Sequence, residues 1–331
     1  MNASELIFDK KTNQIPVSFW RHFAENELID GLQHPEVQQI NLDGHKHYLA
    51  ETQPDFVKLM SDGYFNIPLK GVKDVLNLDD LNNIEAIDAD DAWLTEQIRL
   101  VQQQVALAGK RKTFYNIFSP VSSLKWQLTS HGVKNPDHLV AKWYQENPEK
   151  IKHILTVLAN DTIQQIHAVV KEGGASGIYF STQELQGTSI TEQFFREVQK
   201  EIDQKVITAI IQTAKINILH ICGFEGATNH LDWFKDYDLS IVNWSVKAEK
   251  ISLREGQALF SNKVVLGGFG NGENDVLYSG SVQQIKETVN DILNGIDKNR
   301  IIIGADCTIQ RTTPIENLKA AIVAAKQVVA E

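Results

Sequence analysis

The sequence predicts an α/β protein folded as a (β/α)8 barrel, the TIM barrel architecture. Three observations predict it: eight short apolar runs rich in β-branched and aromatic residues, amphipathic segments between most of them, and a length of 331 residues. Most of the runs are apolar almost throughout, as in parallel strands that are buried on both faces. A doubly wound open sheet is the alternative, but eight strands in a chain of this length fit a barrel with insertions better.

The predicted strands follow one another along the whole chain. They are the runs at 15–20, 56–60, 113–118, 176–181, 216–222, 239–244, 263–269 and 300–305. The pattern is least regular at 20–112, where we expect irregular or helical insertions. No linker rich in Gly, Ser or Pro and no internal repeat interrupts the sequence. Residues 1–331 are therefore predicted to form a single barrel domain.

Segments with apolar residues at three-and-four spacing predict the helices that cover the strands. They span 91–110, 137–171, 189–215, 245–260, 281–296 and 313–331. Ser189 with Glu192, and Ser281, are typical of helix N-caps, and Thr313 before Pro314 offers a cap followed by proline at the first helical position. Strand and helix therefore alternate up to the last predicted helix.

The charge and composition make some partners improbable on physical grounds. The formal net charge is −10 and the pI is about 5.5, whereas nucleic acid and anionic membranes attract a positive surface. No apolar stretch approaches the roughly 20 residues needed to cross a bilayer, and the N-terminal sequence lacks the order of a signal peptide. We therefore expect a cytoplasmic protein whose partners are small molecules or other proteins.

The chain has only two cysteines, and each follows a predicted strand. Cys222 ends the run 216–222 two residues after His220, so both side chains point to one face. Cys307 follows the run 300–305, and the carboxyl ends of barrel strands share one rim. Two thiolates and one imidazole suit Zn²⁺, and three protein ligands with a fourth position open are typical of catalytic sites. The alternative is two buried cysteines packed as small apolar residues beside a hydrogen-bonded histidine.

A zinc ion on these three ligands could activate one of two groups. It could hold a thiol as a thiolate, or turn bound water into hydroxide. Two thiolate ligands donate much charge to the metal and weaken its effect on water, so thiol activation is favoured. Asp306, Glu225 and Asn243 are candidates for a fourth ligand or for an outer hydrogen-bond partner.

Four stretches of the sequence carry a family resemblance. They are PVSFWRHF near the start, HICG at 220–223, KVVLGGFGN with the helix YSGSVQQIKETV, and the closing IIIGADCTIQRTTPIENLKAAI. They resemble the uroporphyrinogen decarboxylase superfamily over nearly the whole chain. The resemblance implies a (β/α)8 barrel and one of two activities: decarboxylation of uroporphyrinogen without a cofactor, or methyl transfer from methylcobalamin to a thiol, with zinc on an HxC motif and a later cysteine.

The resemblance to the decarboxylase branch is incomplete. Arg21 matches the first of two arginines that grip substrate carboxylates in that branch, but Glu25 stands at the second position and would repel an acetate side chain. Asp62, in LMSDGYF, matches the aspartate that binds the pyrrole nitrogens. Cys307 stands where the decarboxylases carry a histidine. These departures favour the methyltransferase branch.

The sequence thus predicts a zinc-dependent methyltransferase that moves a methyl group from a corrinoid to a zinc-activated thiol. Arg21 would hold the acidic group of the acceptor and Asp62 the donor side, while Tyr179 and Asn243 would contribute to the substrate pocket. No corrinoid-binding region is recognisable in the sequence, so the corrinoid is expected on a separate partner protein. The alternatives are uroporphyrinogen decarboxylase and a non-catalytic binder of a tetrapyrrole or corrinoid. The oligomeric state stays open, with a homodimer among the options.

Overall fold

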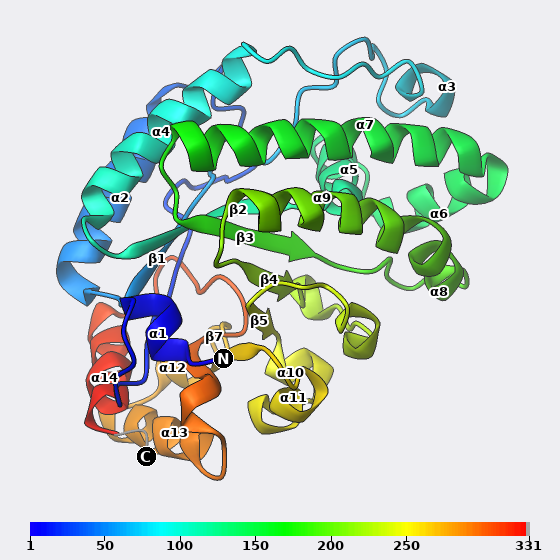
Figure 1. Ribbon diagram of the computed structural model, residues 1–331. Coiled ribbons are helices and arrows are strands. Elements are labelled where there is room, and N and C mark those ends of the chain that lie inside the picture. The colour runs from blue at the N-terminus through cyan, green and yellow to red at the C-terminus, as the bar shows by residue number, and fades with distance from the viewer. Residues whose placement is uncertain (329–331) are drawn as a thin grey trace.

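Seven parallel strands form one continuous, curled sheet in the computed structural model (Figure 1). The structure describes residues 1–328 and the side chains within them except that of Glu225. The strands pair in sequence order and are β1 (Phe56–Leu59), β2 (Lys112–Phe118), β3 (Gly177–Thr182), β4 (Ile218–Ile221), β5 (Ile241–Trp244), β6 (Val264–Phe269) and β7 (Ile301–Ala305). Because all are parallel, their carboxyl ends lie at one rim.

The first predicted strand, 15–20, lies between β7 and β1 without becoming a regular strand. Val17 bridges to Ile303 of β7, and the backbone N–H of Asp55 donates to the Val17 carbonyl at 2.9 Å on the β1 side. The Val17 N–H donates to the Asp55 carboxylate instead of a strand, and Pro16 has no N–H. The sheet therefore curls like a barrel, but within the described residues its ladder has seven strands and not the predicted eight.

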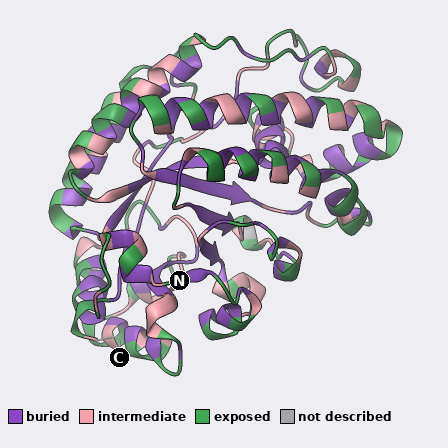
Figure 2. Ribbon diagram, in the orientation of Figure 1, coloured by how far each residue is buried: buried purple, intermediate pink, exposed green. Residues whose placement is uncertain are grey.

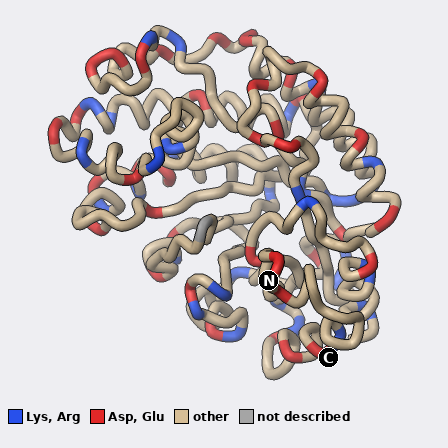
Figure 3. Tube along the Cα trace, turned by 180° about the vertical axis from the view of Figure 1, so that it is seen from behind, with Lys and Arg blue, Asp and Glu red and all other residues tan. Residues whose placement is uncertain are grey.

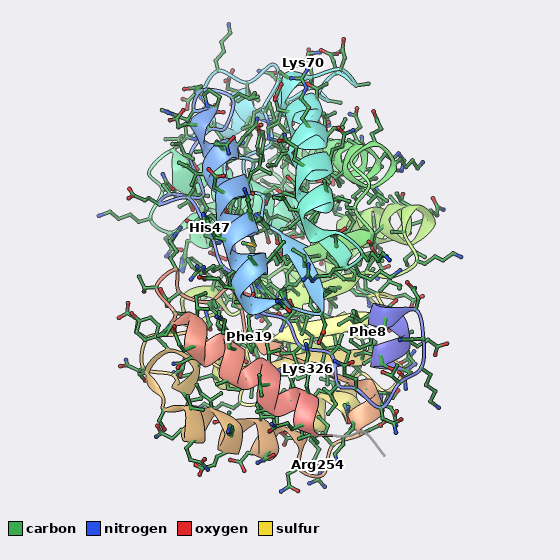
Figure 4. All side chains as sticks on the ribbon, turned by 90° about the vertical axis from the view of Figure 1, so that its left-hand side faces the viewer. Phe8, Phe19, His47, Lys70, Arg254 and Lys326 are labelled. Carbon is green, nitrogen blue, oxygen red and sulfur yellow. The ribbon has the colours of Figure 1, made fainter. Side chains whose placement is uncertain are left out.

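Helices cover the outside of the sheet, except that α1 packs against its inner side. They are α1 (Ala3–Phe8), α2 (Glu36–Thr52), α3 (Leu78–Leu81), α4 (Ala92–Ala108), α5 (Pro120–Ser130), α6 (Pro136–Glu146), α7 (Pro148–His167), α8 (Thr191–Phe194), α9 (Lys200–Thr213), α10 (Val246–Glu249), α11 (Leu253–Leu259), α12 (Val276–Ser279), α13 (Val282–Leu293) and α14 (Ile315–Gln327). One flank, formed by α2, α4 and α14, faces the viewer in Figure 4. None of the described helices combines the length and apolar character that a membrane span requires.

Helices form in the predicted segments, but several of them begin or end at other residues than predicted. The segment 137–171 divides before Pro148, because a residue that precedes proline is disfavoured in a helix. Ser281 forms the expected cap and a reciprocal bond with Gln284. The Ser189 cap is wrong, since α8 begins two residues later without a side-chain cap. The cap predicted before Pro314 is also wrong, because α14 begins one residue after that proline.

The apolar core has two parts, one on each side of the sheet. The larger part lies between the strands and the outer helices, and most strand residues are buried, as Figure 2 shows. The smaller part fills the inside of the curled sheet near the amino ends of its strands, and we call it the floor. Its members include Trp20, Phe56, Phe114, Tyr179, Ile218, Ile241, Val264 and Ile302, together with Ala3 and Ile7 of α1. Polar inner side chains are thus confined to the carboxyl half of the strands.

Candidate metal centre

Three soft ligands meet at the carboxyl ends of β4 and β7. The N–H of Cys222 extends the ladder by donating to the Thr182 carbonyl at 2.8 Å, so Cys222 keeps the face of His220, two residues earlier. Cys307 follows β7. Its Sγ lies 3.5 Å from His220 Nε2, and the ligand atoms of the three side chains lie within 4.8 Å of one another. The structure therefore brings together the three residues that the sequence pattern connects.

A buried asparagine orients the histidine. Asn243 Oδ1 accepts one hydrogen bond from His220 Nδ1 at 2.6 Å and another from the Tyr179 hydroxyl at 2.8 Å. Its Nδ2 donates to the carbonyls of Leu266 and Ala305. With Nδ1 carrying the proton, Nε2 presents a lone pair toward Cys307, which is the arrangement of a metal-ligating imidazole. Asn243 and Tyr179 thus support His220 from behind and are not placed at the pocket wall where the sequence analysis expected them.

The donor set fits a zinc ion. Two sulfurs and one imidazole nitrogen are the ligands of a three-residue zinc site with one position left for another ligand. Asp306 does not join them: its carboxylate accepts from the Ser245 hydroxyl at 3.2 Å and from the Lys247 N–H at 3.0 Å. Burial raises the pKa of Asp306 to about 6. The Glu225 side chain, also a candidate, lies outside the described residues.

The two thiols interact directly with each other. The interaction between the two sulfurs raises the pKa of Cys222 and lowers the pKa of Cys307. His220 and the ammonium of Lys58 also lower the pKa of Cys307. The charges around the cluster therefore favour a thiolate at Cys307, the form in which cysteine binds metals.

A pocket of about 580 Å³ opens beside Cys222. Aromatic rings form one wall, with the Phe118 and Trp126 centroids 5.8 Å apart and the Trp126 and Phe224 centroids 5.7 Å apart. Phe224 is 47% exposed although it is a large apolar side chain. A small ligand with an apolar part would cover these rings while its reactive atom approaches the sulfur.

The opposite wall of the pocket is polar. Lys125 Nζ lies 2.7 Å from the Asp137 carboxylate and donates to Gln183 Oε1 at 2.6 Å. Gln183 in turn donates to the Cys222 carbonyl at 3.0 Å. A charged pair and an amide thus line the same pocket as Cys222, so the pocket contains both a positive and a negative group.

The comparison with known families decides where this chain belongs. A family model described as uroporphyrinogen decarboxylase (URO-D) matches residues 64–328, a range that contains all three soft ligands. The chain belongs to the uroporphyrinogen decarboxylase family. The match begins beyond Arg21 and Asp62, so it carries no information on those two residues. No curated protein sequence matches the chain.

Two solved structures have the same fold as this chain. A methyltransferase from Methanosarcina mazei superimposes with a TM-score of 0.69 and 19% identity, covering 98% of this chain and 97% of that one. A B12-independent methionine synthase from a Shewanella species, in complex with selenomethionine, gives a TM-score of 0.55 and 13% identity, covering 95% and 97%. At such identities the likeness establishes the fold and nothing finer.

Asp62 lies at the rim, as predicted, but both of its carboxylate oxygens already have hydrogen-bond partners within the protein. One carboxylate oxygen lies 2.6 Å from His22 Nδ1, and the other accepts from the N–H groups of Phe23 and Ala24 at 2.8 and 3.1 Å. These hydrogen bonds and the coupled His22 lower the pKa of Asp62 against the effect of burial. Asp62 therefore orients the His22 ring. Sequence reasoning missed His22, although it follows the inward-facing Trp20 by two residues.

Arg21 points away from the other site residues of the family member. Its guanidinium lies 5.2 Å from the centroid of the Tyr48 ring on α2 and donates to the Arg311 carbonyl at 2.9 Å. Side chains alternate along an extended segment, and Trp20 on one side of Arg21 belongs to the floor. The Arg21 side chain therefore lies against α2, and neither of these contacts brings it to the three soft ligands.

A second inner residue, Lys58, also escaped the sequence analysis. It lies in the middle of β1, on the inner face with Phe56 and Met60. Only 6% of the residue is exposed. The single charge within the apolar run FVKLM could have indicated Lys58, because lysine is rarely buried unless it is paired.

Proposed function

We propose that this member of the uroporphyrinogen decarboxylase family is a zinc-dependent methyltransferase that moves a methyl group from a corrinoid to a thiol. One observation carries the proposal: His220, Cys222 and Cys307 place their ligand atoms within 4.8 Å of one another at the rim. The methyltransferase fold neighbour is consistent with a group-transfer enzyme. A cytoplasmic location and a separate corrinoid protein as the methyl donor's carrier complete the proposal.

The chain's own residues prepare the site for an acceptor sulfur. Bound zinc would keep that sulfur as a thiolate at neutral pH. Asn243 holds the His220 ring in the tautomer that leaves Nε2 free for coordination. The apolar floor beneath excludes water from the inner side, and the pocket beside Cys222 receives the rest of the acceptor. Holding the sulfur in line with the methyl group then supplies the main rate gain, through positioning.

The remaining predicted residues receive revised roles in this proposal. Asp62 acts through His22, the rim histidine that it orients, so the donor-side role passes to that ring. Arg21 is not assigned to the acceptor, since its guanidinium lies against Tyr48. The polar wall with Lys125 and Asp137 takes over the contact with the acceptor's charged groups.

Metal analysis and a transfer assay test the proposal together. Protein purified without chelator is expected to hold about one zinc per chain and to methylate a small thiol such as 2-mercaptoethanol with methylcobalamin as donor. Cys307→Ala should lose both the zinc and the transfer. Ser181→Ala, a change in the pocket wall outside the donor set, is the matched control and should keep the zinc. Zinc-free wild-type protein with full transfer would refute the proposal.

Uroporphyrinogen decarboxylase is the second candidate, because the matching family model carries that description. Incubation of the pure protein with uroporphyrinogen distinguishes the two. Coproporphyrinogen formation that survives chelation would establish the decarboxylase. Tight tetrapyrrole or corrinoid binding without any product, unchanged in Cys222→Ala, would instead establish a non-catalytic binder.

A further inference from the structure

Lys58 is a charged side chain among the apolar residues that fill the inside of the curled sheet. Its Nζ lies 3.9 Å from the centroid of the Tyr179 ring and 5.5 Å from that of Trp20. Among the described residues it has no ion pair and no hydrogen bond through Nζ. Most other Lys, Arg, Asp and Glu residues lie on the outer helices and loops, as Figure 3 shows. Burying an unpaired ammonium is costly, so the position of Lys58 requires an explanation.

The ring beneath this ammonium is part of the support of the cluster. Tyr179 donates its hydroxyl to Asn243, which also accepts from His220 Nδ1. The Tyr179 and His220 rings lie 5.3 Å apart between centroids. Lys58 is therefore separated from His220, one of the three soft ligands, by the Tyr179 ring.

The charges near Lys58 are those of the cluster. Burial lowers the pKa of Lys58 to about 8, while the negative charges of Cys307, Cys222 and Asp62 counteract that shift. Asp62 is already bonded to His22 and two backbone N–H groups. The negative charges that Lys58 can still compensate are therefore those of the Cys222 and Cys307 sulfurs.

We propose that Lys58 is the counter-charge that allows an anionic acceptor to bind at the cluster. This inference rests on the proposed function. Two cysteine thiolates neutralise a divalent ion, so an acceptor thiolate adds one uncompensated negative charge to a buried site. An ammonium nearby offsets that charge, and the effect is strong because the surroundings are weakly polarisable. Lys58 is thus a positioning residue that selects thiolates over neutral ligands.

The alternative is a structural lysine that only fills space against two aromatic rings. Such cation–π contacts contribute modestly to the stability of a protein. Loss of that contact would disturb the binding of every ligand at the cluster to the same extent. Loss of a counter-charge would disturb only the anionic ones, so the ratio between two ligands separates the explanations.

The test compares Lys58→Met, Lys58→Arg and Lys263→Met with the wild type. Lys263 is the matched control. It is also buried, but it precedes β6 at the amino ends of the strands, away from the cluster, and it donates to the carbonyls of Tyr237 and Leu239. Each protein is loaded with zinc. Binding of 2-mercaptoethanol, which binds as a thiolate, and of imidazole, a neutral ligand, is then measured, with zinc affinity determined separately by chelator competition.

For Lys58→Met we expect at least a tenfold loss of 2-mercaptoethanol affinity and less than a twofold change for imidazole. Lys58→Arg should recover most of the loss, and Lys263→Met should change neither affinity. Equal losses of affinity for both ligands would refute the role of Lys58 as a counter-charge. Unchanged 2-mercaptoethanol affinity in the zinc-loaded Lys58→Met variant would refute it as well. A wild type that binds no zinc would instead refute the proposed function, so the two failures are distinguishable.

Discussion

The inner face of the curled sheet has two layers that the same strands build for different purposes. In the floor the inner residues of β2, β4 and β5 are Phe114, Ile218 and Ile241, all fully buried. Two residues later, about 7 Å along each strand, the inner positions are polar. They are Asn116, His220 and Asn243. The comparison teaches that one step of the strand period separates packing from chemistry, and each prediction below tests that separation.

The largest effect is expected for the cluster. Cys222→Ser removes a sulfur ligand, and we expect zinc affinity to fall by about a thousandfold or more, because ligand number and type determine the affinity of such sites. The free energy of unfolding in the presence of chelator should change by less than about 1 kcal/mol, since the new side chain is nearly isosteric. Chelator competition and urea unfolding measure the two quantities. A large loss of stability with zinc still bound would show that the layers are not separate.

The reverse effect is expected for the floor. Ile241→Ala removes a fully buried side chain and should lower the free energy of unfolding by about 3 kcal/mol. Zinc affinity should stay within about threefold of the wild type, because the ligands belong to the next layer. Urea unfolding with a parallel metal titration is the measurement. A floor variant that unfolds normally but loses zinc would reverse the assignment.

A smaller effect is expected between the layers, at the support of His220. Asn243→Leu leaves His220 Nδ1 and the Tyr179 hydroxyl without their acceptor. We expect a 10- to 100-fold loss of zinc affinity, as is typical when an outer hydrogen-bond partner of a metal-ligating histidine is removed. Metal titration of the variant against Asn116→Leu, an inner amide on β2 outside the cluster, measures it. Equal losses in both variants would contradict a specific role for Asn243.

An effect on stability alone, without any change in zinc affinity, is expected outside the sheet, where a buried carboxyl group packs behind β3. Burial raises the pKa of Asp203 from 3.8 to about 7. Because the folded state keeps this proton longer than the unfolded state, stability should fall as pH rises from about 4 to about 7, by about 1.4 kcal/mol per pH unit at most. Asp203→Asn should flatten that slope. Urea unfolding between pH 4 and pH 8 tests it, and an unchanged slope would remove Asp203 as its cause.

The sequence was sufficient to predict the strands and the cluster because both depend on local periodicity. Cys222 follows His220 by one strand period, and Cys307 follows the apolar run 300–305, so their common rim could be inferred before any coordinates. The failure of the first predicted strand, 15–20, could not be foreseen in this way. Its failure depends on where the Val17 N–H donates, and the sequence does not show that the acceptor is Asp55.

The site residues near the N-terminus were harder to predict for a physical reason. In 15–20 both faces are apolar and buried, so the pattern gives no sign of which residues point inward. Arg21 was favoured because it matches a carboxylate-gripping arginine of the decarboxylase branch, while the inward-facing His22 beside it was passed over. Lys58 was overlooked because one charge did not disturb an otherwise apolar strand. Distances across the sheet were needed to connect it with the cluster.

X-ray absorption spectroscopy of the zinc-loaded protein tests the central claim most directly. We predict a shell with two sulfurs at about 2.3 Å and one imidazole nitrogen at about 2.0 Å, and a third sulfur when 2-mercaptoethanol is added. A shell of nitrogen and oxygen alone, or a spectrum identical in Cys307→Ala, would contradict it.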